Sequence, residues 1–395
     1  MKTSVAVLFG GRSVEHEVSI ISGLQAYYAL DREKYEPVAV YLSKDNEFYV
    51  GEGIDKVECY RDLPALLAGA TRVLPVAENG TVVLQRYPAK KFGNNVMARF
   101  EVVLPVVHGT NVEDGTLMGL LELLGVPYAA CDVTASAVGM DKFVMKAALK
   151  QAGLPVLDAV QYNARVFVTD TDRVLDEIEA RFAYPVIVKP VNLGSSVGIA
   201  KAGDRAALRR AMDDACGYAA RVLVEPAVTH LREINCAVLG DSDHAIASAC
   251  ERPVASDEIL SYKDKYIAGG KGGDKGGMSS LKRVCPADIP EEMTAQVQEM
   301  AVRTFQALGC CGVSRIDFLN DTESGELWVN EINTIPGSLA FYLWEAAGMP
   351  FAQLLDKMIE LAFKRHRDRA ALTFRFDTNI LDGFGGAKGA KGGKM

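Results

Sequence analysis

Short apolar runs that stop at glycines and lead into helical stretches are the feature that most limits how this chain can fold. Ser4–Phe9 is such a run, and Tyr35–Leu42 and Phe100–Val107 are two further apolar runs that predict strands. Gly115–Leu124 has the pattern of a helix. Strands that alternate with helices predict a parallel sheet covered on both faces, and such sheets bind ligands where their strands end. We therefore predict an N-terminal α/β domain over residues 1–133.

The rest of the chain mixes strands with helices in two further units. Residues 134–225 open with a helical pattern and include the short strand Val186–Lys189. Residues 226–368 contain the strands Val313–Asn320 and Leu327–Glu331, which are expected to pair. A length of 395 residues suits two or three domains, because a single domain usually has roughly 100–200 residues.

Two segments are predicted to be loops from their composition. Residues 261–284 contain a stretch with six glycines in nine residues, and we expect them to form a lid loop. Aromatic and cationic side chains beside those glycines suit a lid that closes over anions, although a solvated mobile loop has the same composition. Residues 369–395 form a tail whose Gly/Lys-rich end cannot bury enough apolar surface to fold.

Composition and charge exclude several classes of protein. Apolar residues make up 49% of the chain and charged residues 24%, which excludes a mainly disordered chain and a small disulfide scaffold. The net charge of −8 argues against nucleic acid as a partner. No apolar run approaches the ~18 residues that span a bilayer. The eight cysteines are scattered, as expected for buried thiols in a reducing cytoplasm.

A glycine- and serine-rich segment, Gly194–Gly198, follows Lys189 between two short strands. Small residues allow backbone N–H groups to approach phosphate oxygens, and a lysine supplies the compensating charge. The same residues also make tight hairpins, so the spacing by itself leaves both interpretations open. The segment lacks the spacing of a P-loop.

Four polar side chains on two adjacent strands predict a metal site. Alternation along a strand puts Arg315 and Asp317 on one face, and Glu331 and Asn333 on one face of the next strand. Two carboxylates and an amide are oxygen ligands of the kind that Mg²⁺ prefers. A solvated surface hairpin is the alternative, which the apolar neighbours of these residues weaken.

Two residues at strand ends are ambiguous when they are read alone. Glu15 lies where the first strand gives way to a helix, and a carboxylate there is more often a helix-start residue than a functional group. His108 ends the third strand. A single histidine is more often structural than catalytic, although the end of a parallel strand is where ligands bind.

Taken together and in this order, these motifs resemble the D-alanine–D-alanine ligases of the ATP-grasp superfamily, from Val5 to about Arg365. The segments that carry the resemblance are Leu8–Gly11, Ser13–Ser19, His108-Gly109, Glu113–Thr116, Met140–Lys142, Val188–Pro190, Gly194–Gly198, Lys265-Tyr266, Arg315–Asp317, Asn330–Thr334 and Pro336-Gly337. The resemblance implies an α/β fold in three domains, in which an N-terminal parallel-sheet domain precedes two α+β domains that hold ATP between them.

The resemblance also implies a reaction in two steps. The carboxylate of one D-alanine attacks the γ-phosphate of ATP, and the amine of a second D-alanine attacks the resulting acyl phosphate. The product, D-Ala-D-Ala, would supply peptidoglycan synthesis. We expect a cytoplasmic homodimer that uses ATP and D-alanine and contacts neither nucleic acid nor a membrane.

Residue by residue, the resemblance implies the following roles. Glu15 matches the group that holds the ammonium of the first substrate, linked to Ser195 and Tyr266. Arg315 and the Gly337 backbone N–H match the oxyanion site. The residues that match contacts to ATP are Lys142, Lys189, Ser195, Ser196, Glu225 (at the adenine), Glu233 (at the ribose) and Lys265. The residues that match ligands of two Mg²⁺ ions, for which Mn²⁺ can substitute, are Asp317, Glu331 and Asn333. The residues expected beside the substrates also include His108, Ser338 and Tyr342.

The sequence departs from the family pattern mainly on the side of the second substrate. Tyr342 falls about where the family has a serine that binds the second carboxylate, and Pro226 and Val112 replace a common lysine and a common glycine. D-serine or D-lactate therefore stays open as the second substrate, as does another carboxylate–amine ligation of this superfamily. A nucleotide-binding regulator without turnover is the alternative from another class, although such a protein has no need of Arg315.

Overall fold

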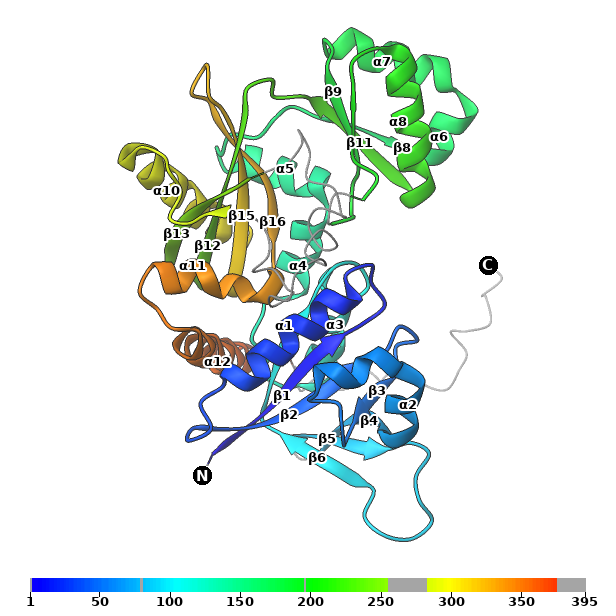
Figure 1. Cartoon of the computed structure of the whole chain (residues 1–395), viewed down its shortest axis with the longest axis vertical. Coiled ribbons are helices and arrows are strands. Elements are labelled where there is room, and N and C mark those ends of the chain that lie inside the picture. The colour runs from blue at the N-terminus through cyan, green and yellow to red at the C-terminus, as the bar shows by residue number, and fades with distance from the viewer. Residues whose placement is uncertain (1, 79–80, 195–196, 255–282, 375–395) are drawn as a thin grey trace, which may run out of the picture.

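The computed structural model describes residues 2–78, 81–194, 197–254 and 283–374, which form three sheets with helices packed against them (Figure 1). The N-terminal unit lies at the bottom of that view, the central unit at the upper right and the C-terminal sheet at the left. The predicted α/β architecture in three parts is confirmed. Most of the predicted lid loop and of the predicted tail lies outside the described residues. None of the described helices is both long and apolar enough to cross a bilayer.

The N-terminal sheet has seven strands in the order β6-β5-β4-β3-β2-β1-β7. They are β1 (Thr3–Gly10), β2 (Tyr35–Leu42), β3 (Phe48–Val50), β4 (Thr71–Glu78), β5 (Thr81–Arg86), β6 (Val96–Phe100) and β7 (Val102–Val107). β1 pairs in parallel with β2 and β7, as predicted, but β3 to β6 add on in antiparallel fashion. The sequence analysis did not predict this antiparallel half, in which the short turn between β2 and β3 is closed by a Ser43 to Glu47 backbone hydrogen bond and leaves no room for a crossover.

Helix α1 (His16–Ala29) packs directly on β1, and this packing fixes the direction of the first turn of the helix. A Cβ atom at Gly23 would stand 2.4 Å from the Cβ of Phe9, so a glycine is required at this close approach. Glu15 occupies the N-cap position of α1, at the carboxyl end of β1. α2 (Leu63–Gly69) and α3 (Thr116–Leu124) complete the helices of this unit.

The central unit is a small antiparallel sheet, in the order β10-β9-β11-β8, with helices on it. Its elements are β8 (Val160–Asn163), α6 (Ala164–Thr169), α7 (Thr171–Arg181), β9 (Val186–Pro190), β10 (Ala200–Ala202), α8 (Arg205–Tyr218) and β11 (Arg221–Pro226). Asp204 caps α8, because its side chain accepts a hydrogen bond of 2.8 Å from the backbone N–H of Ala207.

Two helices precede this unit where the sequence predicts a single helical stretch. α4 (Val133–Met140) and α5 (Lys142–Gln151) are separated at Asp141, whose carboxylate accepts hydrogen bonds from the first turn of α5. Met145 and Leu149 of α5 pack in the same apolar core as Phe305 and Ile316 of the C-terminal unit. α5 thereby presents Lys142 to the C-terminal sheet.

The C-terminal sheet is antiparallel throughout, in the order β14-β13-β12-β15-β16. Its elements are β12 (Leu231–Gly240), β13 (Ala245–Pro253), β14 (Arg283–Val284), α10 (Glu291–Ala307), β15 (Gly312–Asp321), β16 (Leu327–Asn333), a 3-10 turn η3 (Gly337–Ala340), α11 (Phe341–Ala346) and α12 (Phe351–Ala370). The predicted pairing of β15 with β16 is confirmed. Leu354 and Met358 of α12 belong to the core of the N-terminal unit. The two units therefore share a packed interface.

Candidate active site

A cavity of about 780 Å³ lies where the three units meet. Most of the predicted site residues line it: Glu15, His108, Lys142, Lys189, Glu225, Glu233, Arg315, Asp317, Glu331, Asn333, Gly337 and Tyr342. Ser338 is described but is not among the lining residues. Ser195, Ser196, Lys265 and Tyr266 lie outside the described residues. Residues far apart in the chain thus meet around one space.

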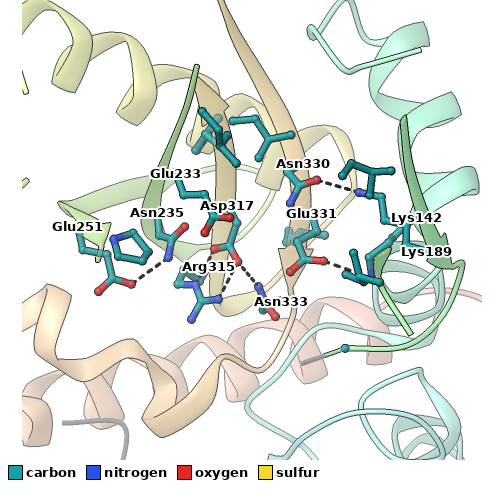
Figure 2. A pocket seen from close by; sticks show the side chains of 18 of the residues that line it. Lys142, Lys189, Glu233, Asn235, Glu251, Arg315, Asp317, Asn330, Glu331 and Asn333 are labelled. Carbon is teal, nitrogen blue, oxygen red and sulfur yellow. Dashed lines mark hydrogen bonds and ion pairs between the residues drawn. The ribbon is translucent and has the colours of Figure 1, made fainter. Parts of the chain in front are cut away.

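A row of polar side chains crosses the C-terminal sheet on the wall of this cavity. Asn235 of β12 is the register partner of Glu251 on β13 and of Asp317 on β15, and Asp317 is in turn opposite Glu331 on β16. Figure 2 shows this polar row, with Glu251 at one end and Lys142 and Lys189 beyond the other. Neighbouring strands are about 4.8 Å apart, so the row spans roughly 14 Å.

Arg315 and Asp317 form a forked ion pair in the middle of the polar row. The guanidinium donates to the two carboxylate oxygens at 2.6 and 2.7 Å, and the Asn333 amide donates to Asp317 at 3.1 Å. Burial alone would lower the pKa of the Arg315 guanidinium, but the adjacent Asp317 carboxylate raises that pKa above its usual value. Arg315 is therefore a permanent cation held at the centre of the cavity.

Two buried lysines lie at the Glu331 end of the polar row. Lys142 is 3.2 Å from the Glu331 carboxylate and donates to the carbonyl of Leu193 at 2.8 Å. Lys189 forms an ion pair of 2.5 Å with Glu225 and donates to Asn330 at 3.2 Å. Both lysines come from elements outside the C-terminal sheet, α5 and β9, and they make this end of the cavity cationic.

Lys146 is a buried partner of Glu225 that the sequence analysis missed. Its ammonium lies 2.9 Å from the Glu225 carboxylate. Burial by itself would raise the pKa of Glu225, and the ammonium groups of Lys189 and Lys146 together lower it below its usual value. The position of Lys146, four residues after Lys142 on the same helix face, is the signal that could have identified it.

Glu15 lies where the N-terminal unit meets the glycine-rich segment. A Cβ atom at Gly109 would stand 2.8 Å from Oε2 of Glu15, and one at Gly194 would stand 3.1 Å from the same oxygen. β9 and β10 pair in antiparallel fashion, and Gly194–Gly198 belongs to the connection of nine residues between them, which is longer than a tight hairpin. Its role in phosphate binding stays a prediction, although Gly194 lines the cavity.

His108 and Ser22 hold the loop that follows β16. The Nδ1–H of His108 donates to the carbonyl of Ile335 at 2.9 Å, and its Nε2 accepts from the Ser22 hydroxyl, also at 2.9 Å. The same hydroxyl oxygen accepts from the backbone N–H of Ser338. Burial lowers the pKa of His108, which agrees with a neutral ring. Both ring nitrogens have protein partners, so contact between His108 and a substrate stays a prediction.

The backbone of residues 338–340 is strained. Ser338, Leu339 and Ala340 have φ angles of 52°, 53° and 51°, although none of them is glycine. Such conformations cost about 1–3 kcal/mol each and persist where the surroundings enforce them. The Ser338 side chain is buried, and its hydroxyl has no hydrogen-bond partner within the described part of the chain. Its predicted place beside a substrate is not tested by this arrangement.

Glu113 is a second buried residue whose role the motif did not reveal. Its two oxygens accept hydrogen bonds of 2.9 Å from the backbone N–H groups of Gly109 and Ile335, and Thr334 adds a third contact at 3.3 Å. Burial raises the pKa of Glu113 to about 8, with the Glu15 carboxylate adding to the rise. Glu113 therefore ties the loop after β7 to the loop after β16.

We expect Glu113→Gln to destabilise the protein, by an amount that depends on pH. A glutamine can accept from only one of the two N–H groups, and an orphaned buried N–H costs about 1–3 kcal/mol. Because the pKa of Glu113 rises from 4.5 to about 8 on folding, the native protein binds a proton that the unfolded chain loses, and stability falls with rising pH across that window. The deficit of the variant should therefore shrink toward pH 8. Urea unfolding at several pH values measures it.

Glu36→Gln is the matched control, because this glutamate is exposed. Its effect on the free energy of unfolding should be small at every pH. A deficit for Glu113→Gln that grows between pH 5 and 8 would contradict the assignment.

Tyr342 lies at the Glu251 end of the polar row. Its hydroxyl donates to Oε1 of Glu251 at 2.8 Å, and the Asn235 amide donates to the same oxygen at 3.0 Å. Burial raises the pKa of Tyr342, and the Glu251 carboxylate raises it further, so the phenol keeps its proton. Tyr342 thus narrows this end of the cavity as a hydrogen-bond donor.

The chemistry of the donors fits a hard cation near Glu331. Asp317 and Glu331 are register partners, and Asn333 supplies an amide beside them. In this structure Arg315 neutralises Asp317, and Lys142 neutralises Glu331. Within the described part of the chain, no cluster of three His, Cys, Asp or Glu side chains is arranged as a metal site. Two carboxylates and an amide therefore need further oxygens, which phosphate groups can supply.

The cysteines are free thiols, as expected, and all eight lie among the described residues. Cys131, Cys236, Cys250, Cys310 and Cys311 are buried, and the other three are half-buried. None of them is a wall residue of the cavity.

Comparison with known proteins identifies the family. The model for the D-ala D-ala ligase N-terminus matches residues 4–131, and that for the D-ala D-ala ligase C-terminus matches residues 148–360. A D-alanine–D-alanine ligase of Acetivibrio thermocellus is 38% identical over 93% of this chain and 97% of its own length. That of Ruminiclostridium cellulolyticum is 38% identical over 96% of this chain and 100% of its own.

Two solved structures share the fold. The D-alanine–D-alanine ligase from Coxiella burnetii has a TM-score of 0.75 at 30% identity and covers 93% of this chain and 96% of its own. The VanG D-Ala:D-Ser ligase from Enterococcus faecalis has a TM-score of 0.76 at 30% identity, covering 92% and 100%. With both halves of the family pattern matched and the ATP-grasp fold in place, the chain belongs to the D-alanine–D-alanine ligase family.

Proposed function

We propose that this protein joins two D-alanine molecules with the hydrolysis of ATP to ADP and phosphate, and that the dipeptide serves peptidoglycan synthesis. The observation that carries the proposal is the polar row, which sets a permanent guanidinium between carboxylates and two buried lysines on one cavity wall. The relatives named D-alanine–D-alanine ligase support it, because they match nearly the whole chain.

The reaction brings anions together, and the cations of the cavity suit that task. In the first step the carboxylate of one D-alanine attacks the γ-phosphorus, which gives an acyl phosphate and ADP. Lys142 and Lys189, at the Glu331 end, would neutralise the phosphate oxygens. In the second step the amine of the other D-alanine attacks the acyl carbon and phosphate leaves. Arg315 and the Gly337 N–H would stabilise the oxyanion formed in between.

Glu15 would hold the ammonium of the first D-alanine. Its carboxylate lies against Gly109 of the N-terminal unit and against Gly194 of the glycine-rich segment. The roles of Ser195, Ser196, Lys265 and Tyr266 belong to the same proposal as predictions from the sequence. A closed lid would protect the acyl phosphate from water.

The metal part of the proposal rests on Asp317, Glu331 and Asn333 as protein ligands for Mg²⁺, two ions in all, with Mn²⁺ as a possible substitute. Their oxygens converge on one face of β15 and β16, and this donor chemistry is what a hard divalent cation requires. A bound ion supplies charge neutralisation at the phosphate oxygens. Around Glu225 and Glu233, which also line the cavity, we place the adenine and ribose of ATP.

The direct test measures phosphate release and dipeptide formation with ATP, Mg²⁺ and D-alanine. We expect both products in equal amounts, and neither without ATP. Phosphate release without dipeptide would point to another carboxylate–amine ligation, and nucleotide binding without turnover would point to a regulator. Sedimentation of the same sample tests the homodimer, which, like the cytoplasmic location, is a part of this proposal that rests on the family resemblance.

D-serine is the second candidate for the acceptor, and Tyr342 is the observation that favours it. The phenol fills space beside Glu251 that the acceptor must share. The similarity to a D-Ala:D-Ser ligase is as high as that to a D-alanine–D-alanine ligase of known structure.

We expect Tyr342→Ser to raise the kcat/KM ratio of D-alanine over D-serine as acceptor by about tenfold, because pocket shape discriminates by ~1–3 kcal/mol. The substitution removes the phenol that fills the space beside Glu251 and restores the residue type that the family has at this position. Ser338→Ala tests the other hydroxyl of this segment, and because Ser338 is buried and is not among the residues that line the cavity, we expect this variant to keep the wild-type profile. If both variants keep the wild-type acceptor profile, this segment does not set specificity. Competition assays with both acceptors supply the ratio.

A further inference from the structure

Arg283 lies at the end of the polar row farthest from the buried lysines, and part of its guanidinium is unused. It begins β14, opposite Pro253 of β13, and lines the same cavity as Arg315 and Gly337. Its guanidinium carbon stands 4.0 Å from the centre of the Tyr342 ring. One terminal nitrogen, NH2, is shielded from solvent and has no hydrogen-bond acceptor in the described part of the chain.

The neighbouring Glu251 carboxylate pairs with only part of the Arg283 guanidinium. Oε1 of Glu251 already accepts from Asn235 and Tyr342, and Oε2 is 3.5 Å from the other terminal nitrogen of Arg283. That distance is at the long limit of a hydrogen bond. Glu251 therefore orients Arg283 but leaves its NH2 nitrogen without an acceptor in the described part of the chain.

The adjacent position on the same pair of strands shows what a satisfied arginine looks like here. Arg252, one residue before Pro253, donates to the two oxygens of Asp288 at 2.6 and 2.8 Å. Arg252 also lines the cavity. The contrast shows that a guanidinium nitrogen without an acceptor is not a general property of the arginines at this edge of the sheet.

We propose that Arg283 binds the α-carboxylate of the acceptor amino acid. This inference rests on the proposed function and adds to it. The phosphates belong at the lysine end and the reacting carbon beside Arg315, so the acceptor amine must come from the Glu251 end. The acceptor brings a carboxylate that takes no part in the reaction into a cavity that already holds Glu251 and Asp317. A guanidinium with free donors matches that group in charge and planar shape.

Tyr342 has a supporting task in this arrangement. Its ring lies against the guanidinium and restricts the plane of the fork, an aromatic contact that favours a cation. Its hydroxyl is directed to Glu251 and is not needed for the acceptor. The recognised ligand is therefore any small amino acid or hydroxy acid whose carboxylate reaches Arg283 while its nucleophile reaches the centre of the row.

The test compares D-alanine with D-alaninamide as acceptors. The amide lacks the carboxylate, and for the same reason it cannot act as the first substrate, so it reports on the acceptor site alone. We expect Arg283→Gln to lower kcat/KM for D-alanine as acceptor about 10- to 100-fold, the loss of a charge-assisted hydrogen bond. Use of D-alaninamide should be unchanged. Arg283→Lys, which keeps the charge, should lie between.

Arg252→Gln is the matched control and should keep the wild-type ratio of the two acceptors. Loss of D-alaninamide use in parallel with D-alanine use in Arg283→Gln would overturn the inference, because the residue would then act on folding or on the first step. Wild-type protein that makes no dipeptide would instead overturn the proposed function.

If a variant makes no dipeptide, hydroxylamine shows whether it still forms the acyl phosphate of the first step. Hydroxylamine attacks the acyl phosphate to give D-alanyl hydroxamate and phosphate, and it carries no carboxylate. Arg283→Gln that still makes the hydroxamate supports the inference, and one that makes neither product contradicts it.

Discussion

Replacing Glu331 by glutamine is expected to lower kcat by on the order of 100-fold or more and to leave the fold intact. A metal at the phosphates contributes several kcal/mol to phosphoryl transfer, and a neutral amide is a much weaker ligand than a carboxylate. Lys142 keeps the carbonyl of Leu193 as a partner, so no buried charge is left without one. Steady-state rates over a range of Mg²⁺ concentrations measure the effect.

Metal binding itself gives a second readout for Glu331→Gln. Titration of Mn²⁺ in the presence of ADP, followed by electron paramagnetic resonance, should show weaker binding to the variant. Glu326→Gln, at an exposed position just before β16, should behave as wild type in both assays. Near-normal turnover of Glu331→Gln at ordinary Mg²⁺ would falsify the assignment of this carboxylate as a ligand.

Lys189→Met should damage both stability and ATP use. Lys189 and Lys146 share Glu225, and all three groups are buried. Removing one partner of a buried ion pair costs roughly 3–5 kcal/mol because a charge is left poorly compensated. The missing phosphate contact should raise the KM for ATP about 10- to 100-fold, from ~1.5–3 kcal/mol for a hydrogen bond to a charged group.

A double variant separates these two effects. Lys189→Met with Glu225→Gln also leaves the buried Lys146 ammonium without its carboxylate, so the free energy of unfolding should fall further than in Lys189→Met while ATP use stays poor. Lys150→Met is the control for loss of a lysine, because its ion pair with Asp158 is long and exposed and should be worth little. Urea unfolding and ATP titrations measure the two quantities. If Lys189→Met has the stability and the ATP dependence of wild type, neither role belongs to Lys189.

The parts of the fold that were predicted correctly are those with local causes. β2 has the predicted bounds. The cap of α8 is also local, because the Asp204 carboxylate accepts a hydrogen bond from the backbone N–H three residues later. Alternation on β15 and β16 was enough to place Arg315 and Asp317 on one face and to bring Glu331 and Asn333 beside them. Period and capping depend on neighbours a few residues away, and these can be read from a sequence.

The sequence missed features whose causes are distant in the chain. Nothing near Glu113 indicates that its carboxylate accepts from Ile335, 222 residues later. The partners of Lys146 and Tyr342 were missed for the same reason. The antiparallel half of the N-terminal sheet also escaped prediction, because short irregular strands such as β3 carry little periodic signal.

By itself the sequence determined the three-part α/β architecture, the family, and the identity of the charged groups around one site, because those depend on local pattern and on the order of motifs. The tertiary structure decided which charges neutralise one another and which one is left with unused donors. Arg252 and Arg283 lie on adjacent antiparallel strands, yet one is saturated by Asp288 and the other is not. Electrostatic and hydrogen-bond energies depend on distances between side chains, and a sequence contains those distances only after the chain has folded.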